Sequence, residues 1–550
     1  MAKLVPSHET SPFWPVRQSG AWARPRAYQV EALAAIPRQG RSIVVLPCGA
    51  GKTLVGAIAA SRLRSESNGA PNILLITYNR EAVAQYVHNL VDNLEIPPFE
   101  IFEYTGNAAA RKRGMSLTSG FKLTHFYMLT QSEPNKESAV YRNYLLTTKW
   151  DAVIVDEAHL APASHFSVAI CKILKNTRCA ISLTATYVRA SDKNMDHIFG
   201  FLGNVVYRLT WTHLERCAFI AKLHFMQVAC ALPPNWKTPW ELCVAQDRLN
   251  VQMLPPSKLE AMLCIVRAHQ AHGEIGLIFA DGLVVVEEAV RTLRNELHQD
   301  WKAVVGETPA AEREQMFKEL NDGNLPGLFF SRVGEASTDF RNPRIRYVII
   351  VCSSGSSETQ FAQRAGRVAR TTYAPVANER DDEVALARRV AHQKHACVYD
   401  LFTVDTNEET WARERVRYIK DEGYVFQTRT SEQLFECVVP PVCAHRVPEA
   451  ESLRLLQRLL AKAHDAHVQR RVNEALLEKQ RQQRQETAVR AKRIGGMREG
   501  IMRDRIVQKE RRGRQARMER HAEARRQEED RVREEMGSAP SLQARARCGL

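Results

Sequence analysis

The sequence of 550 residues predicts an α/β fold made of two tandem parallel-sheet domains, followed by a basic tail that is helical or disordered. Short apolar runs alternate with helix-like runs from Ser42 to about Thr210, and again from about Lys258. Runs that are apolar at nearly every position are typical of parallel strands covered by helices on both faces. The chain is also too long for one core, so its length predicts two or three domains, and the two alternating blocks indicate two of this kind.

The first domain should span residues 22–232, after a short leader of residues 1–21. Helix-like segments such as Arg80–Leu90 and Ser164–Leu174 separate its strands, which is the pattern of βαβ units. The expected strands are Ile43–Leu46, Ile73–Thr77, Phe126–Leu129, Val153–Val155 and Ala180–Leu183.

Two proline pairs, Pro233-Pro234 and Pro255-Pro256, delimit residues 233–257, which we interpret as a linker. The second domain then spans residues 258–430, with helix-like runs at Leu283–Leu297 and Ala310–Leu320. Its expected strands are Gly276–Phe279, Gly327–Phe330 and Tyr347–Val351.

Residues 431–550 form the predicted tail. Leu453, Leu456, Leu459 and Leu460 suggest one amphipathic helix, but apolar positions beyond Lys479 are too sparse for a core. Residues 451–550 contain 26 Lys and Arg against 15 Asp and Glu, which is most of the net charge of +15. A basic tail favours a nucleic-acid partner, and a solvated charged helix is the alternative.

Composition argues against several other classes of protein. A helix that crosses a membrane needs a run of about 18 apolar residues, and the sequence has no such run. We therefore expect no membrane partner. Residues Met1–His8 lack the apolar segment of a secretory signal. The 12 cysteines include no Cys-x-x-Cys pair, which argues against a zinc site or a disulfide framework and favours a reducing compartment.

A glycine-rich loop lies between the first expected strand and a helix-like run. Gly49, Ala50 and Gly51 let backbone N–H groups approach a phosphate, and the helix N-terminus adds partial positive charge. Lys52 would reach the β- and γ-phosphates, and the Thr53 hydroxyl would ligate Mg²⁺. Leu46 stands where the strict motif has glycine, so this is a variant loop. Upstream, Gln29 could read the edge of an adenine, although a surface glutamine is the simpler interpretation.

Three further segments follow expected strands. Asp156 and Glu157 form a carboxylate pair that suits Mg²⁺ binding and activation of a water. The hydroxyls of Thr184 and Thr186 lie near these carboxylates, so they could transmit the state of the bound phosphates to a distant site. In the segment Gln363–Arg370 we expect a helix that places Arg367 and Arg370 on one face, as arginine fingers.

The order of these motifs resembles superfamily 2 helicases. The chain is similar to the XPB/Ssl2 family, the double-stranded DNA translocase of transcription and repair factor TFIIH, over roughly residues 24–430. The segments that carry this resemblance are Leu46–Gly56, Leu183–Arg189, Arg332–Asp339, Ile350–Arg370 and Val404–Phe426.

The resemblance implies two RecA-like domains that bind ATP and Mg²⁺ between them. Thr53 and Asp156 would hold the metal and Glu157 would activate the water. Gln363, Arg367 and Arg370 would complete the site from the second domain. The residues expected to couple hydrolysis to DNA are Thr184, Thr186, Arg189, Gly334 and Asp339.

The resemblance also implies a nuclear ATP-dependent translocase or helicase on double-stranded DNA, in nucleotide excision repair or transcription initiation, with TFIIH or other repair subunits as partners. Ala190 and Ser191 replace two acids of the family, which favours translocation over strand separation. With about 20 residues before the helicase-like part, we expect a shortened paralogue. The alternatives are a non-unwinding ATP-binding scaffold or regulatory subunit, and an RNA helicase.

Overall fold

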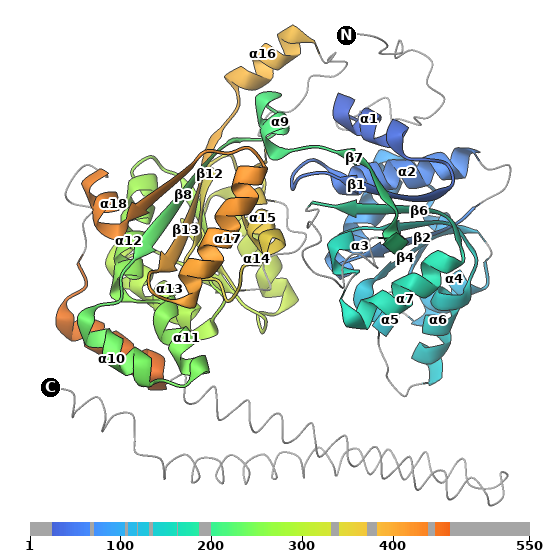
Figure 1. Ribbon diagram of the computed structural model, residues 1–550. Coiled ribbons are helices and arrows are strands. Elements are labelled where there is room, and N and C mark those ends of the chain that lie inside the picture. The colour runs from blue at the N-terminus through green and yellow to red at the C-terminus, as the bar shows by residue number, and fades with distance from the viewer. Residues whose placement is uncertain are drawn as a thin grey trace, which may run out of the picture.

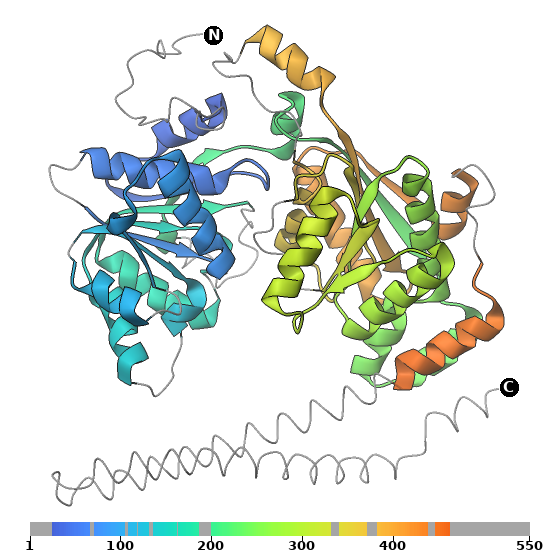
Figure 2. The ribbon, with the colours of Figure 1, turned by 180° about the vertical axis from the view of Figure 1, so that it is seen from behind.

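The computed structural model consists of two lobes, each built around a seven-stranded sheet (Figure 1). Neighbouring strands within each sheet run parallel. Helices cover both sheets, as the view from behind also shows (Figure 2). The described residues are 25–66, 71–104, 108–117, 119–130, 136–161, 163–185, 200–331, 340–370, 382–437 and 446–461.

The first sheet has the strand order β3-β4-β2-β5-β6-β1-β7. Its strands are β1 Gly40–Val45, β2 Asn72–Thr77, β3 Ile101–Glu103, β4 Gly120–His125, β5 Trp150–Val155, β6 Thr177–Thr184 and β7 Asn204–Arg208. The helices of this lobe are α1 Ala27–Ala35, α2 Lys52–Glu66, α3 Arg80–His88, α4 Ala108–Met115, α5 Phe126–Thr130, α6 Lys136–Thr147 and α7 Ser164–Lys175.

The central strands are buried on both faces, as the apolar runs predicted. In β2, Ile73 and Leu75 belong to one apolar core, whereas Leu74 and Ile76 belong to another. Successive side chains of a strand point to opposite faces. Helices on both sides of the sheet therefore require a strand that is apolar at every position.

One predicted strand was wrong. Residues Phe126–Leu129 lie in helix α5, and the strand is the preceding segment β4, Gly120–His125. The segment β4 includes Lys122, Thr124 and His125, so its polar composition concealed a fully buried strand. Phe126 and Leu129 are buried and three residues apart, which is the spacing of one helix face.

The second sheet has the strand order β10-β11-β9-β12-β13-β8-β14. Its strands are β8 Lys222–Cys230, β9 Ile275–Phe279, β10 Lys302–Val304, β11 Gly327–Phe330, β12 Ile345–Ile350, β13 His395–Thr403 and β14 Phe426–Thr430. The remaining labelled α-helices are α9 Trp211–Arg216, α10 Pro234–Leu242, α11 Ala245–Met253, α12 Pro256–Gln270, α13 Leu283–Leu297, α14 Ala310–Asp322, α15 Glu358–Gly366, α16 Glu383–Ala391, α17 Asn407–Asp421 and α18 Ser431–Cys437.

The boundaries between the lobes differ from the predicted ones. Strand β8 pairs with β13 and β14, so the second sheet begins at Lys222 and not after residue 232. Residues 233–257 do not form a simple linker, because they contain α10 and α11 and contribute Trp236, Val251 and Met253 to the second core. The prolines predicted a break, but Pro234 and Pro256 instead start helices.

The second lobe also extends beyond residue 430. Helix α18 packs against α12, β8 and β14. The expected amphipathic helix occupies residues 449–461, seen in orange-red at the lower edge of this lobe (Figure 2). Its Leu456, Leu459 and Leu460 are buried, and Ser452 accepts a hydrogen bond from the Trp236 indole at 3.0 Å. This part of the predicted tail therefore belongs to the domain core.

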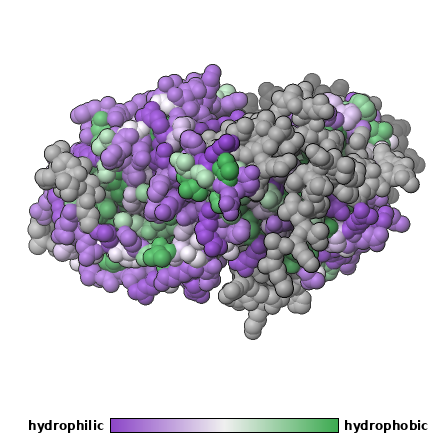
Figure 3. Space-filling view, turned by 90° about the horizontal axis from the view of Figure 1, so that it is seen from above, coloured by the Kyte–Doolittle hydropathy of each residue, from purple (hydrophilic) through white to green (hydrophobic). Residues whose placement is uncertain are grey.

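The segment that runs from Phe219 into strand β8 connects the two lobes. One apolar core contains Val44 and Leu183 of the first sheet and Leu277 of the second, together with Phe219 and Ile220 of this segment. On the face drawn in Figure 3, the described hydrophobic residues form small groups among hydrophilic ones. Among the described residues, no helix is both long and apolar enough to span a membrane.

Buried ion pairs hold the second lobe together. Arg415 donates from Nη2 to Asp400 Oδ1 at 2.8 Å and from Nε to Asp400 Oδ2 at 3.1 Å. Gln227 donates to the same carboxylate at 3.0 Å. The side chains of Arg415 and Asp400 are only 3% and 2% exposed, so each charge is stabilised in the interior mainly by the other.

Arg415→Met is therefore expected to lower the free energy of unfolding by about 3–5 kcal/mol, because the Asp400 charge stays buried without its main partner. Denaturant unfolding measures this change. The matched control is Arg413→Met, since the Arg413 side chain pairs with Glu409 but is 75% exposed. The control should change the stability by less than about 0.5 kcal/mol, and equal effects of the two substitutions would contradict the prediction.

Candidate active site

The glycine-rich loop joins β1 to α2, as the sequence predicted. Leu46 continues the sheet, since its N–H donates to the Thr184 carbonyl oxygen at 3.0 Å. Gly49 and Gly51 have left-handed backbones, with φ of 85° and 76°, a conformation that glycine adopts without strain. Lys52 is buried and is the first residue of α2. The loop therefore ends at a helix N-terminus, an arrangement that favours phosphate binding.

Helix α1 braces this loop from outside. The Tyr28 hydroxyl and the Gln29 side-chain amide both donate to the Ala50 carbonyl oxygen, each at 2.9 Å. The Gln29 side-chain oxygen accepts from the Arg26 N–H at 2.9 Å. A Cβ on Gly51 would lie 2.6 Å from Gln29 Nε2, so the close approach also requires glycine. Gln29 thus lies beside the loop, with both ends of its amide bonded to backbone.

The predicted carboxylates follow β5 at the same edge of the sheet. The Asp156 N–H donates to the Ile76 carbonyl oxygen at 2.9 Å, and Glu157 has a left-handed backbone with φ of 50°. Burial and the Glu157 charge raise the pKa of Asp156 to about 6. Burial alone would lower the pKa of Lys52, but Glu157, Cys48 and Asp156 hold it above its usual value. The two acids and the lysine therefore share one buried site.

His159 links these acids to the end of β6. Its Nδ1 lies 3.3 Å from Glu157 Oε2 and 3.4 Å from the Thr184 hydroxyl. Burial lowers the pKa of His159, which favours the neutral ring. No role was predicted for this histidine, although it stands two residues after Glu157 in the sequence. Thr186 and Arg189 lie outside the described residues.

The predicted arginines come from the end of α15, but not from one helix face. The helix ends at Gly366, Arg367 is its cap, and Arg370 has left the helix to form an antiparallel bridge with Ile220. Gln363 lies within the helix and is half-buried. The expectation of a helix through Arg370 was therefore wrong. Gly334 and Asp339 lie outside the described residues.

The second lobe contacts the phosphate loop directly through this segment. A Cβ on Gly366 would lie 2.3 Å from Cys48 Cβ and 3.3 Å from its sulfur. A Cβ on Gly49 would lie 4.0 Å from both Arg370 Cγ and Ile220 Cγ2. The charges of Arg367 and Arg370 both act on the Cys48 thiol, although burial raises its pKa overall. The structure therefore brings the loop and both arginines together.

Arg364, which the sequence analysis did not single out, anchors α15 within its own lobe. It forms a fully buried ion pair with Asp281, whose carboxylate also accepts from the Ser354 N–H and hydroxyl at 2.7 and 2.8 Å. Burial would raise the pKa of Asp281, but Arg364 and Ser354 hold it below its usual value. The sequence signal for this role is that Arg364 lies three residues after Phe361, on the buried face of the amphipathic helix α15.

The residues present fit Mg²⁺ bound together with a nucleotide. Glu157 Oε2 is buried and makes no hydrogen bond among the described residues, although His159 Nδ1 lies 3.3 Å away. Asp156 carries a raised pKa that a cation would lower. The part of the chain that the structure describes has no cluster of three or more His, Cys, Asp or Glu side chains for a metal. Phosphate oxygens would thus supply the remaining ligands, with Asp156 and Thr53 from the protein.

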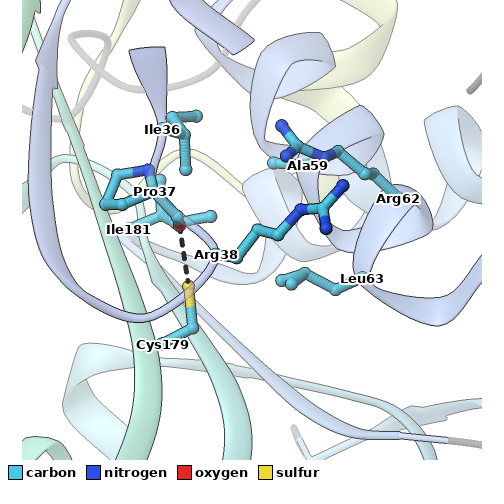
Figure 4. Close-up of a pocket in the computed structure, with 8 residues that line it drawn as sticks. All are labelled: Ile36, Pro37, Arg38, Ala59, Arg62, Leu63, Cys179 and Ile181. Carbon is cyan, nitrogen blue, oxygen red and sulfur yellow. Dashed lines mark hydrogen bonds between the residues drawn. The ribbon is translucent and has the colours of Figure 1, made fainter. Parts of the chain in front are cut away.

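A small hollow lies at the other end of β6 (Figure 4). It encloses about 10 Å³ and is lined by Ile36, Pro37, Arg38, Ala59, Arg62, Leu63, Cys179 and Ile181. The Cys179 thiol donates to the Pro37 carbonyl oxygen at 3.7 Å. Because Cys179 is near the start of β6 and Thr184 is at its end, this hollow is separate from the loop and the acids.

Solved structures support the fold. The S. cerevisiae protein Dbp5, bound to RNA and ADP BeF3, has a TM-score of 0.51 and 12% identity, covering 80% of this chain and 94% of that chain. Mss116p, bound to ssRNA and AMP-PNP, has a TM-score of 0.51 and 14% identity, covering 80% of this chain and 81% of that chain. At these identities the likeness concerns the fold alone.

Sequence comparison is more specific. The XPB subunit of general transcription and DNA repair factor IIH from Danio rerio is 27% identical over 410 residues, covering 74% of this chain and 48% of the relative. The S. cerevisiae subunit XPB/SSL2 is 27% identical over 447 residues, covering 80% of this chain and 48% of the relative. The chain thus spans about half the length of these curated relatives.

Two family descriptions match the two lobes. Residues 23–189 match the type III restriction enzyme res subunit family. Residues 214–489 match the family described as ERCC3/RAD25/XPB C-terminal helicase. That second match covers half of the chain, and it includes α15 with both arginines. The chain therefore belongs to the ERCC3/RAD25/XPB C-terminal helicase family.

Proposed function

We propose that this protein is an ATP-dependent translocase or helicase of the XPB type that acts on double-stranded DNA. The observation that carries the proposal is the contact between Cys48 of the phosphate loop and Gly366 of the second lobe. A nucleotide on that loop would lie between two lobes that already touch. Changes at its γ-phosphate can then alter the position of one lobe relative to the other.

Each residue of the site would have a separate role in ATP hydrolysis. Lys52 would hold the β- and γ-phosphates, and Glu157 would take a proton from the attacking water. Arg367 and Arg370 would stabilise charge on the transferring phosphoryl group. Thr53 and Asp156 would hold Mg²⁺, which neutralises phosphate charge when bound.

Coupling to DNA would run through the end of β6. The Thr184 hydroxyl lies beside His159, and His159 lies beside Glu157, so movement at Thr184 would reach the catalytic acid. We place Thr186, Arg189, Gly334 and Asp339 in the same coupling role on the family resemblance alone. Gln29 would contact adenine after releasing its bond to Ala50.

The cellular role is part of the proposal. The curated relatives are named as subunits of a general transcription and DNA repair factor. We therefore propose a nuclear protein that works in nucleotide excision repair or transcription initiation, with TFIIH or other repair subunits as partners. Basic clusters such as Lys509–Arg514 favour a nuclear location. Imaging of the tagged chain outside the nucleus would contradict this location.

The test is ATP hydrolysis by the purified chain with blunt duplex DNA, single-stranded DNA and RNA of matched length. We expect stimulation by the duplex, with weak dependence on sequence and strong dependence on salt. Lys52→Ala should abolish the stimulated activity, because the phosphates lose their buried cation. Absence of hydrolysis with every nucleic acid would favour the scaffold alternative, and stimulation by RNA but not by duplex DNA would favour an RNA helicase.

A further inference from the structure

The hydroxyl of Tyr86 is a buried polar group that the fold does not use. Tyr86 belongs to helix α3, and its side chain is fully buried. The hydroxyl oxygen is buried as well and has no hydrogen-bond partner among the described residues. Most buried polar atoms in proteins are hydrogen-bonded, because an unpaired one costs stability. A phenylalanine would fill the same space without that cost, so the hydroxyl calls for a functional explanation.

This hydroxyl extends from its own helix toward the helix that follows the phosphate loop. Helix α3 packs against α2, and α2 packs against β5 and β6. A Cβ on Gly56, which lies in α2 one turn after Lys52, would be 2.6 Å from the hydroxyl oxygen. The same Cβ would be 2.8 Å from Leu183 Cδ1 in β6. The hydroxyl therefore lies between α2 and the sheet, in a space that exists because position 56 has no side chain.

The two acids of the ATP site are the charges that act on this hydroxyl. Burial and the Asp156 charge raise the pKa of Tyr86 well above its usual value, and the Glu157 charge contributes further. The hydroxyl therefore keeps its proton and is available as a donor. In turn, the Lys52 charge, the Glu157 N–H and the Tyr86 hydroxyl limit the rise that burial causes in the pKa of Asp156. The hydroxyl is thus directed at the Asp156 carboxylate.

The Asp156 carboxylate is held from the protein side by one backbone hydrogen bond. Its Oδ1 accepts from the Glu157 N–H at 2.9 Å. Mg²⁺ demands nearly ideal octahedral geometry, so the orientation of each ligating oxygen matters. In metal sites, hydrogen bonds from surrounding groups to a ligating carboxylate supply that orientation. A second donor on Asp156 would therefore serve metal binding, and the unpaired Tyr86 hydroxyl is suited to this role.

We propose that Tyr86 is a positioning residue for the metal, whose hydroxyl donates a hydrogen bond to the Asp156 carboxylate in the loaded site and so orients the oxygen that ligates Mg²⁺. This inference rests on the proposed function, in which Mg²⁺ and ATP bind at the phosphate loop. Without a nucleotide, the hydroxyl is directed at the carboxylate but does not form the bond. The role of Tyr86 is thus distinct from that of Lys52, which contacts the phosphates themselves.

Tyr86→Phe removes only the hydroxyl, so it tests this role directly. The measurement is the Kd of a fluorescent, non-hydrolysable ATP analogue, with excess Mg²⁺ and with EDTA. With Mg²⁺, Tyr86→Phe should bind the analogue about 10- to 100-fold more weakly than the wild type, which is the usual effect of losing a partner of a metal ligand. In EDTA the two proteins should bind equally, because the phosphate loop is unchanged.

Tyr347→Phe is the matched control. Tyr347 is also fully buried, and its hydroxyl has no hydrogen-bond partner among the described residues. This hydroxyl likewise packs against a glycine, since a Cβ on Gly276 would lie 2.5 Å from its oxygen, but it belongs to β12 of the second sheet. The control should bind the analogue as the wild type does in both conditions. Both variants should keep the wild-type midpoint of denaturant unfolding, because neither loses a hydrogen bond.

A double-mutant cycle shows whether Tyr86 acts through Asp156. Asp156→Ala removes the metal ligand and should weaken binding of the analogue in Mg²⁺. In that background Tyr86→Phe should cause no further loss, because the hydroxyl has no carboxylate left to orient. The binding of Mn²⁺ to the complex of protein and analogue, followed by the EPR signal of free Mn²⁺, should show the same pattern. A full additional loss in the Asp156→Ala background would assign the hydroxyl to the packing of α3 on α2 and overturn the proposal.

The binding results separate this inference from the function on which it rests. If the wild type binds the analogue no more tightly with Mg²⁺ than in EDTA, the Mg²⁺ site of the proposed function fails. If Mg²⁺ strengthens binding by the wild type and by Tyr86→Phe to the same extent, only the positioning role is overturned. A loss for Tyr86→Phe that is equal with and without Mg²⁺ also overturns it, because the hydroxyl would then support the phosphate loop and not the metal ligand.

Discussion

Glu157→Gln is expected to reduce DNA-stimulated ATP hydrolysis by about 10²- to 10⁴-fold while leaving ATP binding intact. Glutamine has nearly the same shape as glutamate but cannot take a proton from the attacking water. Lys52 and the glycine loop are unchanged, so the nucleotide should still bind. Steady-state turnover and equilibrium binding of a fluorescent ATP analogue measure the two properties separately.

The position of Glu157 is the reason why we assign the role of general base to this acid and not to its neighbour. Asp156 accepts a hydrogen bond from the Glu157 N–H at 2.9 Å and is buried at 6% exposure. Glu157 turns out of the strand through its left-handed backbone, and its Oε2 makes no hydrogen bond among the described residues, with His159 Nδ1 3.3 Å away. Asp156 is thereby suited to a metal and Glu157 to a water.

The control for this prediction is Asp151→Asn on the same strand. Asp151 is exposed near the start of β5 and accepts a hydrogen bond from the Asn72 N–H at 2.8 Å. An asparagine can keep that bond, so hydrolysis should remain within about twofold of wild type. If Glu157→Gln also retains more than about a tenth of the wild-type rate, Glu157 is not the general base.

The sequence was sufficient to predict seven of the fourteen strands in the two sheets, because a strand covered on both faces must be apolar throughout. It failed where this rule is broken. Strand β4 contains Lys122 and His125, and its neighbour α5 is more apolar than the strand itself. Strand β8 was not predicted as a strand, and nothing in its local pattern indicates that it pairs with β13 across more than 150 residues.

In the candidate site, too, local motifs could be predicted from the sequence and long-range contacts could not. Lys52, Asp156 and Glu157 could be predicted because their motifs are local and follow strands. The contact of Cys48 with Gly366 could not, because it depends on how two separately folded sheets approach each other. The same holds for Gln29, which was predicted to read the edge of an adenine, because its hydrogen bond to Ala50 could not be predicted from the sequence.

Gly366→Ala is expected to lower ATP hydrolysis about 100-fold or more, with a much smaller effect on ATP binding. Gly366 does not have a left-handed backbone, so its conformation does not require glycine. The added methyl would instead lie 2.3 Å from Cys48 Cβ, a distance that forces a displacement. Tyr28 and Gln29 hold the loop through Ala50, so we expect α15 to move away. A shift of about 1 Å at a catalytic group can cost about 10²-fold in rate.

A second substitution at position 48 tests whether this contact is the cause. Cys48→Gly removes the Cβ that collides with the new methyl, so it should restore much of the activity of Gly366→Ala. Cys48→Ala removes only the sulfur and leaves the Cβ, so it should not. A double-mutant cycle on turnover gives the coupling between the two positions.

Gly355→Ala is the matched control, since a Cβ at Gly355 would meet nothing within 4 Å and the residue lies shortly before the same helix, α15. Its activity should equal that of the wild type. If Gly366→Ala is as active as this control, the lobes do not need the Cys48 contact for catalysis. If both Cys48 variants fail to restore Gly366→Ala, the defect lies within α15 and not between the lobes. If Cys48→Gly restores the activity of Gly366→Ala and Cys48→Ala does not, the rate of hydrolysis depends on the packing of the phosphate loop against the second lobe.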